Sequence, residues 1–297
     1  MHLVTYRKDV DCAARLGAVV GDLVVDLERL GTRSGRPLPP SMQAFIELGP
    51  EAVRGTSAML AGYGHDFPPD VARPLHNVEL LAPITRPRKN IFAVGLNYVD
   101  PDAGAAKGMP DKPVYFTKPP TTVVGPEGAI RHDQAITRQL DWEVEMAVII
   151  GTRARGVPAP EALRYVFGYS LIVDITARDC MRSGQLLYAK GLDSYAPFGP
   201  AIVTADEIAD PHDLELSLAV NGATKQSSST RYMYFKVDTL ISDLSQGMTL
   251  EPGDIIATGT PGGIGARRSP QEWLWPGDVV DAHLEGVGSL HSPVIAV

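Results

Sequence analysis

The sequence predicts an α+β protein in which short strands outnumber helices. Glycine and proline account for 29 and 25 of the 297 residues and occur along the whole chain, which indicates many turns and short strands rather than a helix bundle. The apolar fraction of 44% and the charged fraction of 21% are typical of a globular protein with ample material for a buried core. The length fits one large domain or two smaller ones.

Charge and cysteine content exclude several classes of protein. With 27 Lys plus Arg against 35 Asp plus Glu, the net charge of −8 disfavours nucleic acid as a partner. Cys12 and Cys180 cannot form a disulfide scaffold or a metal knuckle. The chain starts without the apolar run of a signal peptide, and its longest apolar stretches are only strand-sized. We therefore expect a cytoplasmic protein that does not span a membrane.

Residues 1–75 are predicted to form a small separate domain. Gly21-Asp22 separates two β-rich runs, which is a hairpin pattern, and Ser41 is suited to cap a helix. The expected elements are a hairpin over residues 15–27, helices over 41–48 and 51–60, and a linker at Phe67-Pro68-Pro69 and Arg73-Pro74.

Residues 76–297 are predicted to be mainly strands. Leucines and valine alternate over residues 214–220, and Asn221-Gly222 follows as a hairpin turn because both residues tolerate positive φ. Two Pro-Gly-Asp turns, at 252–254 and 276–278, each lead into a β-branched run. Short helices are expected over residues 160–167 and 237–244.

Glu143 and Glu145 are the most informative pair of residues. Residues two apart on a strand share a face, so both carboxylates should point the same way. An isolated Glu-x-Glu pair usually lies on a solvated edge strand. Here the apolar run from Met146 to Ile150 favours a central strand instead. Two carboxylates in such a strand would repel each other unless a cation lay between them.

A third carboxylate follows another β-rich run. Asp174 ends the segment that begins at Gly168, although an aspartate at the end of a strand is often only a turn former. Three carboxylates without nearby His or Cys would make an all-oxygen site. Such a site suits Mg²⁺ or Mn²⁺ and does not suit structural zinc.

Several motifs resemble, in order and spacing, those of the fumarylacetoacetate hydrolase superfamily in its bacterial form with a small N-terminal domain. They are Gly95-Leu96-Asn97-Tyr98, Asp141-Trp142-Glu143-Val144-Glu145, residues 173–179, Lys190-Gly191-Leu192-Asp193, Pro197-Phe198-Gly199-Pro200, Val220-Asn221-Gly222, Ser229-Thr230 and Thr258-Gly259-Thr260-Pro261. The resemblance implies a small α/β domain over 1–75, then a catalytic domain over 76–297 built as a mixed β-roll with short helices. It also implies a homodimer.

The resemblance implies a role for each matching residue. The metal ligands would be Glu143, Glu145 and Asp174, the active-site lysine Lys190, and the substrate-binding residues Tyr98, Thr260 and Met181. A divalent cation held by three carboxylates keeps about one net negative charge, so an anionic oxo acid would need the positive charge of Lys190. The alternatives are a solvated surface lysine and, for Thr260, a turn residue.

The sequence departs from the family pattern where hydrolases activate water. Pro101 and Gly104 occupy the positions of the usual His and Glu, and neither can accept a proton. Met181 replaces a family glutamine. Asp100 or Asp102 could serve as the base, with Asp102 the candidate catalytic residue, although a simple Asp-Pro-Asp turn is favoured. His132 lies outside this segment and is not assigned a role.

These observations predict a metal-dependent enzyme acting on a small 2-oxo acid or β-diketo, acylpyruvate-like substrate. The nominal reaction is hydrolysis of a C–C bond through an enolate. The alternative is a non-hydrolytic relative, an isomerase or tautomerase, a decarboxylase or a cyclase, with Lys190 as proton carrier. A degenerate binding module is disfavoured because buried carboxylates without a cation are costly.

Overall fold

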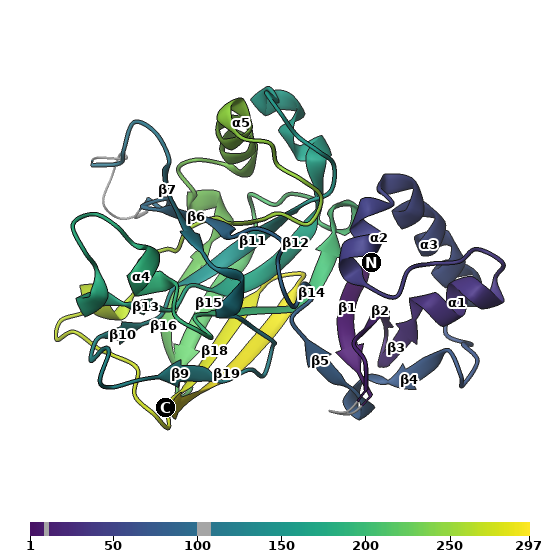
Figure 1. Ribbon diagram of the computed structural model, residues 1–297, viewed down its shortest axis with the longest axis horizontal. Coiled ribbons are helices and arrows are strands. Elements are labelled where there is room, and N and C mark those ends of the chain that lie inside the picture. Colours follow the sequence, from purple (N-terminus) through teal and green to yellow (C-terminus); the bar gives the residue numbers. More distant parts are fainter. Residues whose placement is uncertain (9–11, 100–107) are drawn as a thin grey trace.

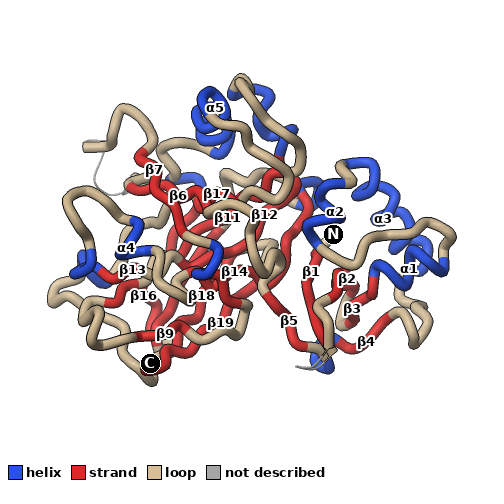
Figure 2. Tube along the Cα trace, viewed as in Figure 1, coloured by secondary structure: helices blue, strands red, loops and turns tan. Residues whose placement is uncertain are grey.

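Most of the chain is strand in the computed structural model, which describes residues 1–8, 12–99 and 108–297 (Figures 1 and 2). The largest sheet in this part of the chain has twelve strands. Its main path runs, in spatial order, through β4 (Ala72–Pro74), β3 (Leu23–Asp26), β2 (Arg15–Val20), β1 (His2–Arg7), β14 (Ala196–Thr204), β12 (Val166–Val173), β11 (Val144–Ile150), β17 (Ile255–Ala257), β6 (Ile91–Gly95) and β7 (Val114–Lys118). Off this path, β5 (Glu79–Leu81) pairs with β1, and β8 (Val123–Val124) pairs with β14.

Two smaller sheets and short helices complete the fold, which is the mixed, strand-rich class predicted from the sequence. The second sheet is ordered β16 (Ala223–Ser229), β15 (Glu215–Val220), β18 (Val279–Leu284), β19 (Gly288–Ala296) and β9 (Ile130–His132), and β10 (Leu140–Asp141) pairs with β13 (Thr176–Ala177). The α-helices are α1 (Leu27–Arg33), α2 (Met42–Glu47), α3 (Pro50–Tyr63), α4 (Leu187–Lys190) and α5 (Val237–Gly247). The 3₁₀-helices are η1 (Leu75–Asn77), η2 (Pro120–Thr122), η3 (Ala159–Tyr165), η4 (Arg178–Cys180), η5 (Ala205–Glu207), η6 (Thr230–Tyr232) and η7 (Gly265–Arg267).

Strand β11 lies in the interior of the large sheet, between β12 and β17, and is buried along its whole length. Its side chains alternate between two apolar clusters: Met146 and Val148 pack in one, and Ala147 and Ile149 in the other. A strand that is buried on both faces needs apolar side chains at successive positions, because neither face meets water. This accounts for the apolar residues that follow Glu145. The prediction of a central strand is confirmed.

The N-terminal segment joins the same sheet. Strand β1 pairs antiparallel with β14 through His2↔Val203 and Leu3↔Ile202, so one sheet continues from the N-terminal strands into the rest of the chain. Helices α1, α2 and α3 lie together in the N-terminal segment (Figure 1), and α2 also packs against β12, where the rings of Phe45 and Phe167 lie 6.3 Å apart. The boundary at residue 75 stays a prediction.

The structure confirms the predicted hairpin turns and the predicted helix cap. Residues 15–26 form the β2–β3 hairpin, and Ser41 caps α2 by accepting a hydrogen bond from the backbone N–H of Ala44. Asn221 and Gly222 both have positive φ between β15 and β16, as a tight hairpin turn requires. Turns and caps depend on residues that are adjacent in the chain, so the sequence alone can predict them.

Two local predictions are wrong. The segment at Arg73-Pro74 is not a linker, because β4 pairs with β3 and closes the sheet edge, where proline is tolerated. The helix expected over 160–167 is the 3₁₀-helix η3, which ends at Tyr165. Val166 and Phe167 belong to β12, since pairing with β11 and β14 outweighs the local helical preference.

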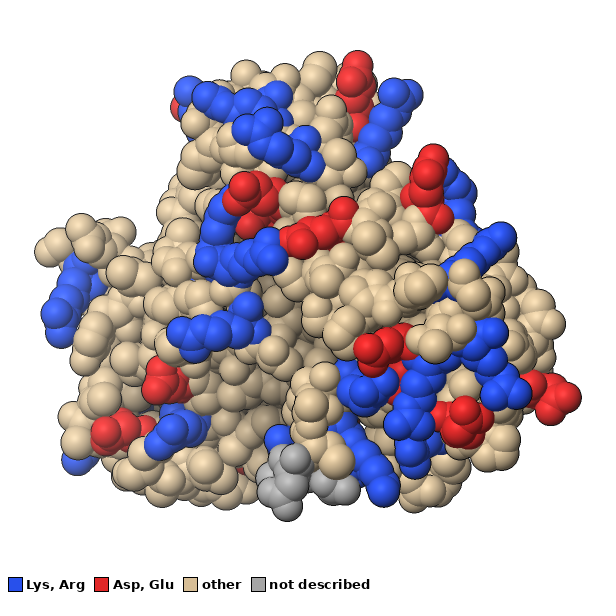
Figure 3. Space-filling view, turned by 45° about the vertical axis from the view of Figure 1, so that its right-hand side comes forward, with Lys and Arg blue, Asp and Glu red and all other residues tan. Residues whose placement is uncertain are grey.

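Acidic and basic side chains are interspersed on the face of the molecule shown in Figure 3, which agrees with the modest net charge. Across the described residues, no helix combines the length and the apolar character needed to cross a membrane.

We expect Asp26→Asn to destabilise the fold by about 1–3 kcal/mol at neutral pH, because Arg15 loses its ionic partner and the other donors lose a charged acceptor. Asp26 caps α1 and accepts hydrogen bonds from Tyr6 (2.9 Å), Arg15 (2.5 Å) and the backbone N–H of Arg29 (3.0 Å). Burial alone would raise the pKa of Asp26, but these donors, Arg15 foremost, hold it below its usual value.

A lowered folded-state pKa stabilises the protein above the unfolded value and loses that effect as the pH falls. Urea unfolding should therefore show the difference between wild type and Asp26→Asn shrinking below the ordinary aspartate pKa of 3.8. A difference that stayed constant down to low pH would contradict the ionic role of Asp26.

Candidate functional site

The three predicted carboxylates come together where β11 begins and β12 ends. Glu143 immediately precedes β11, Glu145 lies within it, and Asp174 follows β12. The two strands run antiparallel with Val144 opposite Val173, so the start of one lies beside the end of the other. One carboxylate oxygen from each acidic residue lies within 4.8 Å of the others, and all three residues are buried.

Lys190 is part of this cluster. It ends α4, is only 3% exposed, and its ammonium donates to Glu143 Oε2 at 2.8 Å, Asp174 Oδ2 at 2.6 Å and Thr176 Oγ1 at 2.7 Å. The alternative of a solvated surface lysine is therefore wrong. Burial opposes the charged form, but Asp174 and Glu143 outweigh it and raise the pKa of Lys190. The side chain is held protonated, with all three N–H bonds engaged.

A second buried lysine, missed in the sequence, contacts the same cluster. Lys118 at the end of β7 is fully buried and donates to Asp174 Oδ1 at 2.6 Å, to the carbonyl of Ile175 at 3.3 Å and to the carbonyl of Lys190. Burial lowers its pKa, against the opposing effect of Asp174. Lys118 thus ties the metal-ligand candidate Asp174 to the end of α4. A single lysine before two prolines gives no sequence signal for this role.

Asp141 and Arg178 form the outer part of the network. Arg178 donates to Asp141 Oδ2 at 2.8 Å and to Glu143 Oε1, which fixes the Glu143 carboxylate. Asp141, fully buried, also accepts from the backbone N–H groups of Gly265 (2.6 Å) and Ala266 (3.0 Å). It thereby fastens the turn η7 to the acidic cluster.

Glu145 differs from the other carboxylates because no lysine or arginine of the described residues pairs with it. It accepts one hydrogen bond, from the backbone N–H of Gly259 at 2.9 Å. Burial raises the pKa of Glu145 well above its usual value, and the neighbouring charges of Asp174 and Glu143 raise it further. A bound cation would reverse this effect, since it favours the charged carboxylate.

The chemistry of this donor set fits a hard divalent cation. Oxygen ligands from two or three carboxylates are what Mg²⁺, Mn²⁺ and Ca²⁺ take in proteins. With Asp141 included, four carboxylates face three cationic side chains in the described residues, so one negative charge has no partner there. Within the described part of the chain, this is also the one cluster of three acidic, His or Cys residues close enough to hold a metal.

A cavity of about 530 Å³ opens onto the cluster. Glu143, Lys190 and the three predicted substrate-binding residues, Tyr98, Thr260 and Met181, all line it. Thr260 is more than a turn residue, because its hydroxyl donates to the carbonyl of Val144 at 2.9 Å and accepts from Gln226 at 2.8 Å. Met181, 39% exposed, belongs to the apolar part of the wall.

The Tyr98 hydroxyl is the polar group of the cavity wall that stands out. It is buried and has no hydrogen-bond partner among the described residues. Burial raises the pKa of Tyr98, and the charge of Glu145 adds to the effect, so the hydroxyl is protonated at neutral pH. An unpaired buried donor in a pocket is costly unless a ligand or water meets it.

The proposed base Asp102 lies outside the described residues, as do Asp100, Pro101 and Gly104. The choice between a base and a simple turn at Asp100-Pro101-Asp102 stays open on this structure. His132, which was not assigned a role, is buried away from the cavity wall, and its Nε2 lies 3.0 Å from the carbonyl of Thr137.

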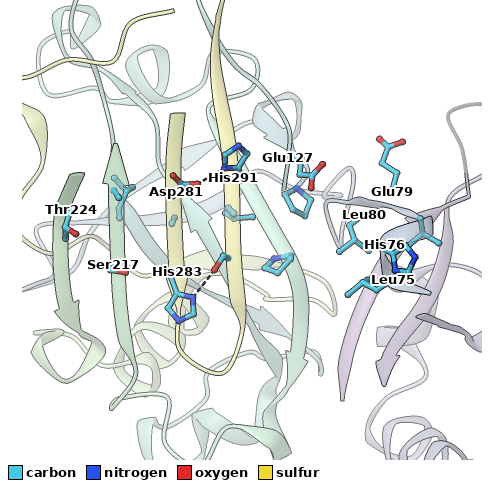
Figure 4. Close-up of a pocket in the computed structure, with 18 residues that line it drawn as sticks. Leu75, His76, Glu79, Leu80, Glu127, Ser217, Thr224, Asp281, His283 and His291 are labelled. Carbon is cyan, nitrogen blue, oxygen red and sulfur yellow. Dashed lines mark hydrogen bonds and ion pairs between the residues drawn. The ribbon is translucent and has the colours of Figure 1, made fainter. Parts of the chain in front are cut away.

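A larger cavity, about 790 Å³, lies between the segment 75–80 and strands of the second sheet (Figure 4). Two of the three histidines that line it pair with neighbours: His291 with Asp281 at 2.6 Å, and His283 with Ser289 at 3.0 Å, as the dashed lines in Figure 4 show. None of the three clustered carboxylates lines it. The smaller cavity is therefore the candidate active site.

Known proteins share both the sequence and the fold. The family model described as "Fumarylacetoacetate (FAA) hydrolase C-terminal" matches residues 90–295. Oxaloacetate tautomerase fahd2, mitochondrial, of Xenopus laevis is 35% identical over 99% of this chain and 90% of its own length. Oxaloacetate tautomerase YisK of Bacillus subtilis is 41% identical over 74% of each chain.

Solved structures match over the full length of the chain. The fumarylacetoacetate hydrolase of Exiguobacterium antarcticum gives a TM-score of 0.83 at 38% identity and covers 100% of both chains. The maleylpyruvate hydrolase of Sphingobium sp. SYK-6, in complex with manganese (II) ion and pyruvate, gives 0.78 at 29% identity and covers 100% of this chain and 99% of its own.

Lys118→Met should lower the free energy of unfolding by about 3–5 kcal/mol, because it leaves the buried Asp174 carboxylate without one of its cations. Lys112→Met, at an exposed position, is the matched control and should change stability by less than about 0.5 kcal/mol. Urea unfolding of both variants tests this. A Lys118→Met protein as stable as the control would show that Lys190 alone neutralises Asp174.

Proposed function

Because this chain belongs to the fumarylacetoacetate hydrolase superfamily, we propose that it is a divalent-metal-dependent enzyme that interconverts the keto and enol forms of a 2-oxo acid, with oxaloacetate as substrate. The observation that carries the proposal is the cluster of Glu143, Glu145 and Asp174 with Lys190 beside it, of which Glu143 and Lys190 line the 530 Å³ cavity. The relatives that match this chain are enzymes of the same superfamily.

Tautomerisation is favoured over the nominal C–C hydrolysis for a chemical reason. Hydrolysis needs an activated water, and Pro101 and Gly104 offer no proton acceptor where hydrolases of the family carry His and Glu. Tautomerisation only moves a proton between carbon and oxygen of the substrate and consumes no water. Two of the relatives are named oxaloacetate tautomerases, which supports the alternative reading over the nominal one.

Glu143, Glu145 and Asp174 would hold the cation, Mg²⁺ or Mn²⁺. The manganese in the related maleylpyruvate hydrolase supports this class of metal. When bound, the cation supplies Lewis-acid stabilisation of the negative charge that develops on the substrate oxygens. The family default of a homodimer stays a prediction.

Lys190 contributes a fixed positive charge rather than a base. Its three N–H bonds are engaged and its pKa is raised, so the ammonium of the described state has no lone pair with which to accept a proton. A positive charge held at this position favours an anionic substrate and its enolate. To act as the proton carrier predicted from the sequence, Lys190 would first have to break these hydrogen bonds.

Tyr98 is the better candidate for direct hydrogen bonding to the substrate. Its hydroxyl is protonated, buried and without a partner among the residues described, and it lies close enough to Glu145 to feel its charge. We place it as the donor to a substrate oxygen. A base at Asp102 remains a prediction from the sequence.

Glu145→Gln should weaken Mn²⁺ binding by more than about 100-fold, because it replaces a metal-ligand carboxylate with a neutral amide of the same shape. Enolisation of oxaloacetate should be lost with it. Calorimetric titration of Mn²⁺ and the rate of α-proton exchange in deuterated buffer measure the two effects. Glu51→Gln, 91% exposed on α3, is the matched control. Wild-type metal affinity in Glu145→Gln would refute the assigned site.

Solvent isotopes separate tautomerisation from hydrolysis. In deuterated water enriched in heavy oxygen, the enzyme should exchange the C3 protons of oxaloacetate without producing carboxylate fragments that carry the heavy oxygen. An acylpyruvate panel under the same conditions should give no labelled cleavage product. Cleavage of an acylpyruvate that places one heavy oxygen in the released carboxylic acid, and a deuteron on the pyruvate methyl group, would instead restore C–C hydrolysis as the reaction.

A further inference from the structure

Two adjacent arginines, Arg267 at the end of the 3₁₀-helix η7 and Arg268 directly after it, differ in their contacts. The Arg268 side chain contacts other residues of the protein: it forms an ion pair with Glu272 at 2.7 Å and donates a hydrogen bond to the carbonyl of Lys225 at 3.4 Å. Arg267 is exposed, and its side chain has no ion pair or hydrogen bond within the described residues. Only Arg267 lines the cavity of the candidate active site.

Among the described residues that line this cavity, Arg267 is the basic residue without an ion pair. The other basic residues described in its wall are Arg178 and Lys190, and both are engaged: Arg178 by Asp141 and Glu143, Lys190 by Glu143 and Asp174. An anionic group bound away from the acidic cluster therefore finds its opposite charge at Arg267.

The position of Arg267 is fixed by the same network that builds the cluster. Asp141 accepts hydrogen bonds from the backbone N–H groups of Gly265 and Ala266 at 2.6 and 3.0 Å. A side chain at Gly265 would approach the carbonyl of Glu272 to 2.1 Å, so only glycine allows this close packing. Because Asp141 also holds Arg178, the turn keeps a set distance from the Glu143 carboxylate.

The remaining wall limits what such an anion could otherwise contact. Leu96, Met181, Leu186 and Ile264 line the cavity with apolar side chains. A carboxylate placed against them would lose its hydration without gaining a hydrogen bond, which is unfavourable. A guanidinium group, in contrast, binds a carboxylate through two parallel hydrogen bonds.

We propose that Arg267 binds the second carboxylate of a dicarboxylic 2-oxo acid, so that the enzyme selects dianionic over monoanionic substrates. This inference rests on the proposed function, which places the 2-oxo-acid head group at the acidic cluster. Arg267 is a specificity-determining residue in this assignment. The chemistry at the head group depends on the cluster and not on Arg267.

Paired ligands that differ only in the second carboxylate test the assignment. Oxaloacetate and 2-oxobutanoate are the reactive pair, followed by α-proton exchange. Malate and 2-hydroxybutanoate are the unreactive pair, followed by calorimetry in the presence of Mg²⁺. The variants are Arg267→Gln, which removes the charge, and Arg267→Lys, which keeps it. Arg54→Gln, an exposed arginine on α3 that does not line this cavity, is the control.

In Arg267→Gln, the KM for oxaloacetate and the Kd for malate should each rise about tenfold, as expected for a lost charge-assisted hydrogen bond. The kcat for oxaloacetate and both constants for the monoanions should change less than about twofold. Arg267→Lys should recover part of the loss, and Arg54→Gln should resemble wild type.

Two results would overturn the assignment. Unchanged malate binding in Arg267→Gln would show that another group holds the second carboxylate. Equal weakening of malate and 2-hydroxybutanoate would show that Arg267 only supports the turn. The proposed function fails separately, if wild-type enzyme exchanges no α-protons of oxaloacetate. In that case, malate binding that still depends on Arg267 keeps the binding assignment.

Discussion

The buried ion network at the ends of β11 and β12 is the constraint on which the rest of the site depends. Its charged members are Asp141, Glu143, Glu145 and Asp174 on one side and Lys118, Arg178 and Lys190 on the other. Taking so many charges out of water is costly, and apolar side chains of similar volume often stabilise a fold equally well. Glu145, which has no ion pair among the described residues, is the carboxylate whose charge a bound cation would neutralise.

The fold can place this network because β11 lies in the middle of the large sheet. Its neighbours in space then come from distant parts of the chain, and this also explains which elements could be predicted. Hairpins and caps depend on neighbouring residues such as Gly21-Asp22 and Ser41, so they could be predicted from the sequence. The edge strand β4 and the start of β12 depend on pairing with other strands, so local patterns misled there.

The candidate site divides in the same way. The acidic side was predictable from local patterns, because Glu143 and Glu145 lie two residues apart where β11 begins and Asp174 directly follows β12. Lys118 was not, because its role is a contact with Asp174, 56 positions along the chain. Asp141 accepts hydrogen bonds from the backbone N–H groups of Gly265 and Ala266, 124 and 125 positions away, and these bonds help to position the segment that carries Arg267. Burial and long-range contact, rather than residue type, make these side chains functional.

Some polar side chains around the cavity form hydrogen bonds with the protein and others have no partner among the described residues. This difference supports enolisation of a bound oxo acid. Lys190, Arg178 and Thr260 use their hydrogen bonds on the protein and so fix geometry. The Tyr98 hydroxyl and the Arg267 guanidinium have no partner in the described residues, so a ligand can meet them. One buried donor beside Glu145 and one cation at the rim match an oxo acid with a second carboxylate. Enolising such a molecule requires polarisation of its carbonyl, which a cation at the acidic cluster would supply, and one proton acceptor, for which Asp102 is the candidate from the sequence. Cleaving it would in addition require an activated water, and Pro101 and Gly104 stand where hydrolases of the family carry the residues that activate it.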